Sequence, residues 1–174
     1  RTGDPRQRGA FQSVKRRARA YYSDAMTLPR IPIAAPVIGE EEIANVMEAM
    51  RSGWISSLGA FVGQFEREFS AFCGVAHGVA VANGTTALHL ALVAAGVGPG
   101  DEVLIPSLTF VATANVVRYC GATPVFADSE RETWQLDPAG IEARITPRTK
   151  VIIPVHLYGH PCDMDAILTI ANHH

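Results

Sequence analysis

The sequence predicts an α/β protein whose mostly parallel sheet is covered by helices on both faces. From residue 78 onward, short apolar runs alternate with segments of helical periodicity, which is the pattern of strand–helix–strand units. The runs are apolar at nearly every position, as expected for strands that are buried on both faces. A hydrophobic content of 48% and a charged content of 18% over 174 residues are typical of a globular protein with a core of its own.

Two helices are predicted ahead of this alternation. Gly39-Glu-Glu-Glu42 indicates a helix start, because acids in the first turn interact favourably with the helix dipole, and Gly53 lies just beyond the end. The apolar stripe of this helix is Ile43, Val46, Met47 and Met50. A second helix is predicted from about Phe61 to Phe72. Its phenylalanines recur at helical spacing, and we interpret them as core rather than as a ligand site: Phe61, Phe65, Phe69 and Phe72.

The remaining elements follow in strict alternation. Strands are predicted at Gly78–Ala82, Glu102–Pro106, Thr123–Ala127 and Val151–His156. Helices are predicted at about Thr86–Ala95, Ala112–Tyr119, Pro138–Ile145 and Met164–Ala171.

Charge and cysteine content suggest the domain organisation and the compartment. Residues 1–30 carry eight of the fifteen basic residues and two of the seventeen acidic ones, although the net charge of the whole chain is -2. This basic head is typical of a nucleic-acid arm or a transit segment, but we interpret it as a disordered extension, with the folded part at 31–174. Three widely spaced cysteines without a CxxC pair suggest free thiols and a cytoplasmic location, with no membrane partner and no metal site.

The turn Asn83-Gly-Thr-Thr86 lies between a predicted strand and a predicted helix. Ligands in open α/β sheets bind beyond the carboxyl ends of the strands, and a helix start offers unpaired N–H groups to an anion. Gly84 lets the backbone approach a ligand, and Thr85 and Thr86 add hydroxyl donors. The turn therefore suggests a phosphate site, although Asn and Thr would serve equally well as simple helix caps.

Several long motifs resemble those of the DegT/DnrJ/StrS sugar aminotransferases. They are SGWISSLG, VANGTTALHLAL, GVGPGDEVLIPSLTFVATANVV, GATPVFAD and VIIPVHLYGHPCDMDAI, in the order in which the family has them. The resemblance implies an incomplete three-layer α/β/α large domain of the type I aminotransferase fold, which uses pyridoxal 5'-phosphate (PLP). The segments GWISS, DSERETWQLDP and HLYGHPCDMDAI are similar to those of the perosamine synthase subgroup. Members of that subgroup transfer an amino group from glutamate to a nucleotide-linked 4-keto-6-deoxy sugar.

The resemblance assigns expected roles to single residues. Gly84 and Thr85 match positions that hold the PLP phosphate, and Phe110 matches an aromatic that stacks on the pyridine ring. Without the family, Phe110 would be interpreted as core. Trp54, Ser56 and Ser57 match a loop near the sugar substrate, or form a surface turn. His156 either contacts the cofactor or bonds a neighbouring loop.

The catalytic groups of the family are not expected within this chain. The chemistry needs a Schiff-base lysine and a carboxylate on the pyridine nitrogen, and in the family both follow the point where this sequence stops. Lys15 lies in the basic head, and Lys150 precedes a predicted strand, so it is expected at the amino end of the sheet. We therefore expect a truncated, inactive piece of an aminotransferase that is a homodimer when complete.

Two other classes of function stay open. The first is a non-catalytic binding or regulatory module on the same fold, which a lysine further along the coding sequence would exclude. The second is a nucleic-acid-binding protein led by the basic head. The part beyond residue 30 is acidic and has no basic stripe with interleaved aromatics, which argues against nucleic acid as a partner.

Overall fold

A computed structural model describes residues 32, 34–56 and 58–174. The basic head at 1–30 and Ser57 lie outside these residues, so the predictions made for them stay predictions. The chain divides into two units, Arg1–Gly59 and Ala60–His174, which are described separately. In the part of the chain that the structure describes, no helix is both long and apolar enough to cross a bilayer.

The first unit contains helix α2 (Glu40–Ser52), as predicted. At its start the Gly39 N–H donates to Oε2 of Glu42 at 2.7 Å, which is the half of a capping box that needs no side chain at the N-cap. Its end is Gly53, whose φ of 73° is the left-handed conformation that glycine adopts most easily. The N–H of Gly53 donates to the Met50 carbonyl at 3.3 Å, which closes the last turn.

The second unit begins with helix α3 (Ala60–Phe72), whose phenylalanines are not core in the described chain. Phe65, Phe69 and Phe72 stack along one face, with ring centroids 5.3 Å and 6.3 Å apart. They are nevertheless 54%, 53% and 87% exposed, so the interpretation of the stripe as core is wrong here. α3 is joined to the segment that follows it by Glu66, whose Oε1 accepts a hydrogen bond from the Ala80 N–H at 2.8 Å.

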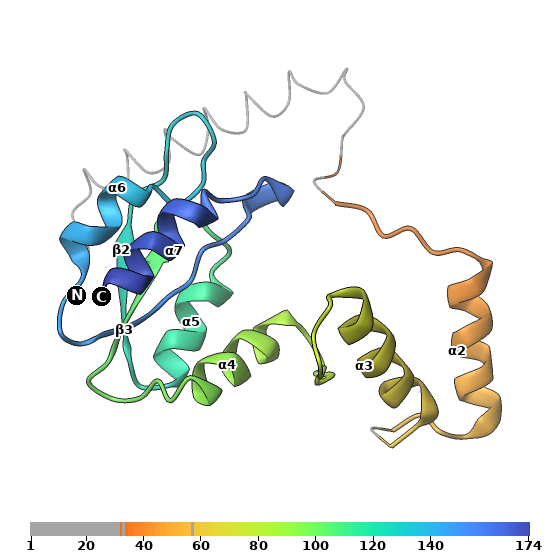
Figure 1. The fold of residues 1–174 in the computed structure, drawn as a ribbon. Coiled ribbons are helices and arrows are strands. Elements are labelled where there is room, and N and C mark those ends of the chain that lie inside the picture. Colours follow the sequence, from red (N-terminus) through yellow and green to blue (C-terminus); the bar gives the residue numbers. More distant parts are fainter. Residues whose placement is uncertain (1–31, 33, 57) are drawn as a thin grey trace, which may run out of the picture. The chain divides into compact units, whose positions relative to one another are not determined.

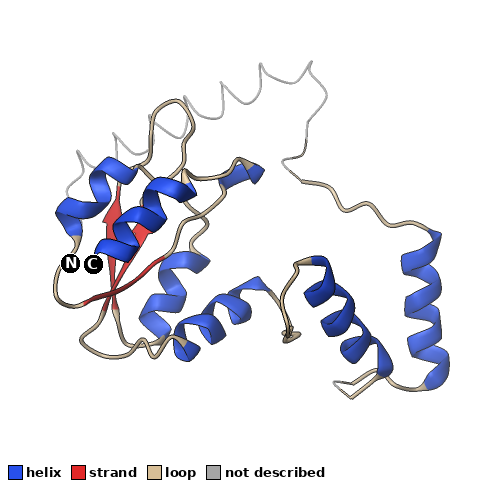
Figure 2. Cartoon of the chain, viewed as in Figure 1, coloured by secondary structure: helices blue, strands red, loops and turns tan. Residues whose placement is uncertain are grey.

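Three parallel strands form the sheet in the order β2-β1-β3 (Figures 1 and 2). They are β1 (Glu102–Pro106), β2 (Thr123–Ala127) and β3 (Thr149–Ile152). All five residues of β1 are buried, as expected for a central strand that is covered on both faces. The predicted bounds of β1 and β2 are confirmed.

Helices cover both faces of this sheet (Figure 1). Val103 and Ile105 of β1 pack against α4 (Gly84–Ala94) and α5 (Ala112–Tyr119) on one face. Leu104 points to the opposite face, because successive strand residues alternate. There it joins a cluster with α6 (Pro138–Ile141) and α7 (Met164–His173). The predicted three-layer α/β/α arrangement is confirmed.

Two predicted strands differ from the structure. Residues 78–82 form no strand, because a strand needs a paired neighbour and the Ala80 N–H bonds the Glu66 side chain instead. The last strand begins earlier than predicted, at Thr149, and ends at Ile152. Ile153 still donates to the Leu104 carbonyl at 2.8 Å, but Pro154 has no N–H with which to continue the ladder.

The predicted helix at 138–145 also divides. α6 ends at Ile141, and the 3₁₀ turn η1 (Glu142–Arg144) continues it. Asp137 caps the start, where its Oδ1 accepts a hydrogen bond from the Ala139 N–H at 2.9 Å. A second 3₁₀ turn, η2 (Leu157–Gly159), follows β3 and leads into α7.

Candidate functional site

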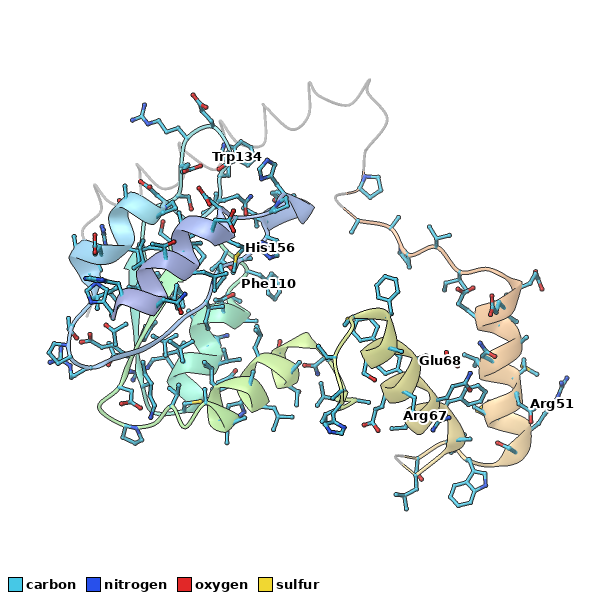
Figure 3. All side chains as sticks on the ribbon, viewed as in Figure 1. Arg51, Arg67, Glu68, Phe110, Trp134 and His156 are labelled. Atoms are coloured by element: carbon cyan, nitrogen blue, oxygen red, sulfur yellow. The ribbon has the colours of Figure 1, made fainter. Side chains whose placement is uncertain are left out.

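A cavity of about 640 Å³ lies where the loops after β1 and β3 meet the start of α4. Its volume falls within the range of about 300–1,000 Å³ that is usual for small-molecule sites. The four residues predicted to bind the cofactor, Gly84, Thr85, Phe110 and His156, all line it, and Figure 3 shows Phe110 and His156 at the same edge of the sheet. The other lining residues are Ala87, Leu88, Thr109, Ala112, Thr113, Ile153, Pro154 and Val155.

The start of α4 provides unpaired donors at this cavity. Asn83 is the N-cap, and its Oδ1 accepts hydrogen bonds from the Thr86 N–H at 2.9 Å and from the Thr86 hydroxyl at 3.1 Å. The cap leaves the N–H groups of Gly84 and Thr85 outside the hydrogen-bond ladder of the helix. Thr86, predicted as a second hydroxyl donor to a ligand, instead uses its hydroxyl in the cap. The turn is therefore both a capped helix start and a potential anion site.

The absence of a side chain at Gly84 leaves a space that no other part of the described chain fills. A Cβ placed at this position would meet no protein atom within 4 Å. The space that glycine leaves therefore lies on the open side of the turn, where a phosphate could approach the backbone N–H groups.

Phe110 presents its ring to the cavity instead of packing in the core. It is 75% exposed, which excludes the core interpretation for the described chain. Beside it, the hydroxyls of Thr109 and Thr113 bond each other at 2.9 Å, so that they satisfy one another within the cavity wall. The result is a flat apolar face next to an anion site, which suits a planar ring carrying a phosphate.

Of the two alternatives for His156, the bond to a neighbouring loop is present, and contact with the cofactor stays a prediction. His156 lines the cavity, and its Nδ1 accepts a hydrogen bond from the Cys162 N–H of the following loop at 3.1 Å. Because Nδ1 is an acceptor, the neutral imidazole carries its proton on Nε2. His156 thus offers an N–H donor.

Comparison with known proteins identifies the family. The model of the DegT/DnrJ/EryC1/StrS aminotransferase family matches residues 36–174. The chain belongs to this aminotransferase family. The resemblance found in the sequence motifs is confirmed.

Individual relatives refine the comparison. GDP-perosamine synthase of Caulobacter vibrioides is 59% identical over 84% of this chain and 40% of its own length. The spore coat polysaccharide biosynthesis protein SpsC of Bacillus subtilis is 54% identical over 83% of this chain and 37% of its own length. A putative sugar aminotransferase from Streptococcus pneumoniae, solved in a PLP form and a PMP form, gives a TM-score of 0.76 at 40% identity, over 82% of this chain and 36% of that one.

The chain therefore spans about two fifths of the length of the curated relatives it matches. PLP is the cofactor of solved members of this aminotransferase family. The cavity fits that group in three respects: two backbone donors at a helix start for the phosphate, a flat exposed ring for the pyridine, and an imidazole N–H for a polar substituent.

The opposite edge of the sheet, at the amino ends of the strands, carries several charged groups. Nζ of Lys150 donates to the Gly96 carbonyl at 2.5 Å and lies 3.6 Å from Oδ2 of Asp101. Lys150 is thus at the amino end of β3, as predicted, and the described residues that line the cavity include no lysine.

A buried carboxylate also lies at this edge. Glu102 is 7% exposed and accepts hydrogen bonds from the Thr146 hydroxyl at 2.6 Å and from Nε of Arg148 at 3.0 Å. The Thr146 hydroxyl and then the Arg148 guanidinium lower the pKa of the Glu102 carboxyl below its ordinary value, although burial acts in the opposite direction. These bonds fasten the start of β1 to the segment that leads into β3.

The residues predicted to contact the sugar belong to the other unit. Trp54 is 58% exposed in the loop after α2, and its backbone N–H donates to the Ser52 hydroxyl at 3.4 Å. The Ser56 carbonyl accepts a hydrogen bond from the Gly59 N–H at 3.3 Å, and Ser57 lies outside the described residues. Their role near a substrate stays a prediction.

Several residues of the cavity were not predicted from the sequence. Thr109 and Thr113 flank Phe110 along the chain, and Pro154 and Val155 precede His156. Their proximity to predicted site residues is the signal that could have found them. Gln135 and Cys162, which hold the loop of His156, gave no such signal.

Proposed function

We propose that this chain is part of a PLP-dependent nucleotide-sugar aminotransferase that moves an amino group from glutamate to a 4-keto-6-deoxy sugar nucleotide, as a perosamine synthase does. The observation that carries the proposal is the convergence of Gly84, Thr85, Phe110 and His156 on one cavity at the carboxyl edge of the parallel sheet. The identity to two differently named sugar-pathway proteins supports the class of substrate. The activity is that of the whole protein.

Each cavity residue has a distinct role in this proposal. The N–H groups of Gly84 and Thr85, with the Thr85 hydroxyl, bind the cofactor phosphate at the positive end of the α4 dipole. The Phe110 ring covers one face of the pyridine and excludes water from it. Nε2 of His156 donates to a polar substituent of the ring. Bound PLP supplies the electron-accepting ring that amino transfer requires.

We do not expect the described residues to provide the covalent link to the cofactor. Lys150 is engaged by Gly96 and Asp101 at the amino edge of the sheet, and Lys15 lies outside the described residues. After incubation with PLP and reduction with borohydride, we expect mass analysis to find no adduct on Lys150. A stable reduced adduct on Lys150 would show that its position at the amino edge does not keep it from the cofactor.

The sugar is expected to contact the loop with Trp54, Ser56 and Ser57, and the complete protein is expected to be a homodimer. An exposed tryptophan in a glycine-flanked loop is a typical anchor for a ligand or a partner subunit. In the complete protein, Trp54→Ala should raise the KM for the sugar nucleotide and leave the PLP affinity unchanged. Sedimentation as a strict monomer would contradict the homodimer.

The direct test uses the full-length protein that contains these residues. The protein is incubated with PLP, glutamate and GDP-4-keto-6-deoxymannose, and the aminated sugar nucleotide is detected by its mass. A protein that binds PLP but transfers no amino group to any 4-keto-6-deoxy sugar nucleotide would favour the binding or regulatory module. A protein that does neither would refute the proposal.

A further inference from the structure

The carboxamide of Gln135 is buried between two loops near the cavity. The residue is 3% exposed, and its Nε2 donates to the carbonyls of Thr133 at 3.0 Å and Leu157 at 3.2 Å. Its Oε1 accepts from the Leu157 N–H at 2.9 Å and from Sγ of Cys162 at 3.6 Å. Leu157 presents a donor and an acceptor together, and the carboxamide in this orientation satisfies both. Gln135 therefore binds the Leu157 backbone as a neighbouring strand would.

Leu157 directly follows His156 and fixes the turn that contains it. The Leu157 N–H also donates to the Val155 carbonyl at 2.8 Å, and the His156 angles, φ -75° and ψ 74°, are those of an inverse γ-turn. The next residue, Tyr158, has φ 53°, a strained conformation for an aromatic residue. Such a backbone persists only where its surroundings over-determine it, and the two bonds from Gln135 to Leu157 contribute to that.

Cys162 makes a second connection between Gln135 and His156. Besides donating its N–H to Nδ1 of His156, Cys162 places its thiol 3.2 Å from the Val155 carbonyl and 3.6 Å from Oε1 of Gln135, so these two acceptors share its single proton. Cys162 is 5% exposed, so the thiol is a buried donor within this network. The Cys162 N–H thus favours the tautomer with the proton on Nε2, and Gln135 acts on the imidazole through Leu157 and Cys162.

We infer that Gln135 is a positioning residue for the cofactor: its bonds to Leu157 and Cys162 hold the His156 imidazole in the orientation in which Nε2 donates into the cavity. The inference rests on the proposed function, because that function gives Nε2 its partner on PLP. A merely structural role predicts a loss of stability alone. A positioning role predicts a loss of PLP affinity that depends on His156.

A double-mutant cycle in the full-length protein separates these two roles. Gln135→Glu keeps the size of the side chain and can still accept from Leu157, but a carboxylate cannot donate to the two carbonyls. We expect Gln135→Glu and His156→Ala each to weaken PLP binding about fivefold, the effect of one ordinary hydrogen bond, and the double variant to be no weaker than either single one. Additive effects, about 25-fold in the double variant, would overturn the inference.

Glu102→Gln is the matched control. It replaces a buried carboxylate by a carboxamide, the reverse of Gln135→Glu, and it lies at the amino ends of the strands, away from the cavity. We expect it to lower the thermal stability and to leave PLP affinity unchanged. If Gln135→Glu lowers only the stability, as this control does, then Gln135 is structural and the inference is wrong.

Nitrogen-15 NMR of the His156 ring in the cofactor-free protein tests the inference apart from the proposed function. We expect the tautomer protonated on Nε2 in the unmodified protein and a mixture of tautomers in Gln135→Glu. A ring that keeps its tautomer in Gln135→Glu overturns the inference, even if no PLP binds. Absence of PLP binding by the unmodified protein overturns the proposed function instead. If Gln135→Glu does not fold, Gln135→Met, which removes both donor and acceptor, is measured in the same way.

Discussion

Replacing Phe110 with alanine should weaken cofactor binding strongly and leave the fold intact. The side chain is 75% exposed, so its removal should change the free energy of unfolding by no more than about 0.5 kcal/mol. A covered aromatic side chain buries about 150–250 Å², so a ligand on one face of this ring removes roughly 75 Å² from water. At about 25 cal/mol per Å² this is about 2 kcal/mol, or about 25-fold in PLP affinity.

The assay is a PLP titration of the full-length protein together with thermal unfolding. Phe126→Ala is the control, because Phe126 is also well exposed, at 52%, but lies on β2 and is not one of the residues that line the cavity. We expect Phe126→Ala to bind PLP as the unmodified protein does. Equal affinities for the two variants, or a loss of stability in Phe110→Ala that accounts for its weaker binding, would refute the stacking role.

Two further predictions follow from the two edges of the sheet. Thr85→Ala should weaken PLP binding roughly tenfold or more, because a charge-assisted hydrogen bond is worth about 1.5–3 kcal/mol. Thr86→Ala should affect mainly the cap at Asn83, since the Thr86 hydroxyl bonds Asn83. A PLP titration in which Thr86→Ala binds more weakly than Thr85→Ala would contradict this prediction. The pKa of Glu102 is lowered in the folded state, so its stabilisation is present above the ordinary value of 4.5 and is lost as the pH falls through the folded value. Urea unfolding between about pH 6 and about pH 3 should therefore show a steeper loss of stability in the unmodified protein than in Glu102→Gln, and parallel curves would contradict the assignment.

Local patterns predicted the elements whose partners lie within the described chain. The strand at Glu102–Pro106 and the helix at Ala112–Tyr119 have the predicted bounds, because their apolar residues face neighbours that are present. The segment Gly78–Ala82 has the composition of a strand, but pairing depends on a neighbour that composition cannot supply.

The candidate site was predictable to a similar extent. Gly84 was suggested by its place between a predicted strand and a predicted helix. Phe110 was assigned only through the resemblance to the family, and both residues line the cavity. The Gln135 network was not predictable, because it joins residues far apart in sequence whose contact depends on tertiary packing. For the same reason the burial of Phe69 was predicted wrongly, since helical spacing identifies a face but not what covers it.

The position of β1 between β2 and β3 has a consequence for synthesis on the ribosome. β1 and β2, with α5 between them, can pair as soon as they leave the ribosome. The other side of β1 stays unpaired until β3 has been made. Until α7 follows, Leu104 also lacks its full cover on that face. A nascent chain that pauses between β2 and β3 therefore exposes an apolar strand with unpaired backbone groups, which is the form most prone to pairing with another chain. The speed of translation across this interval thus bears directly on the yield of folded protein.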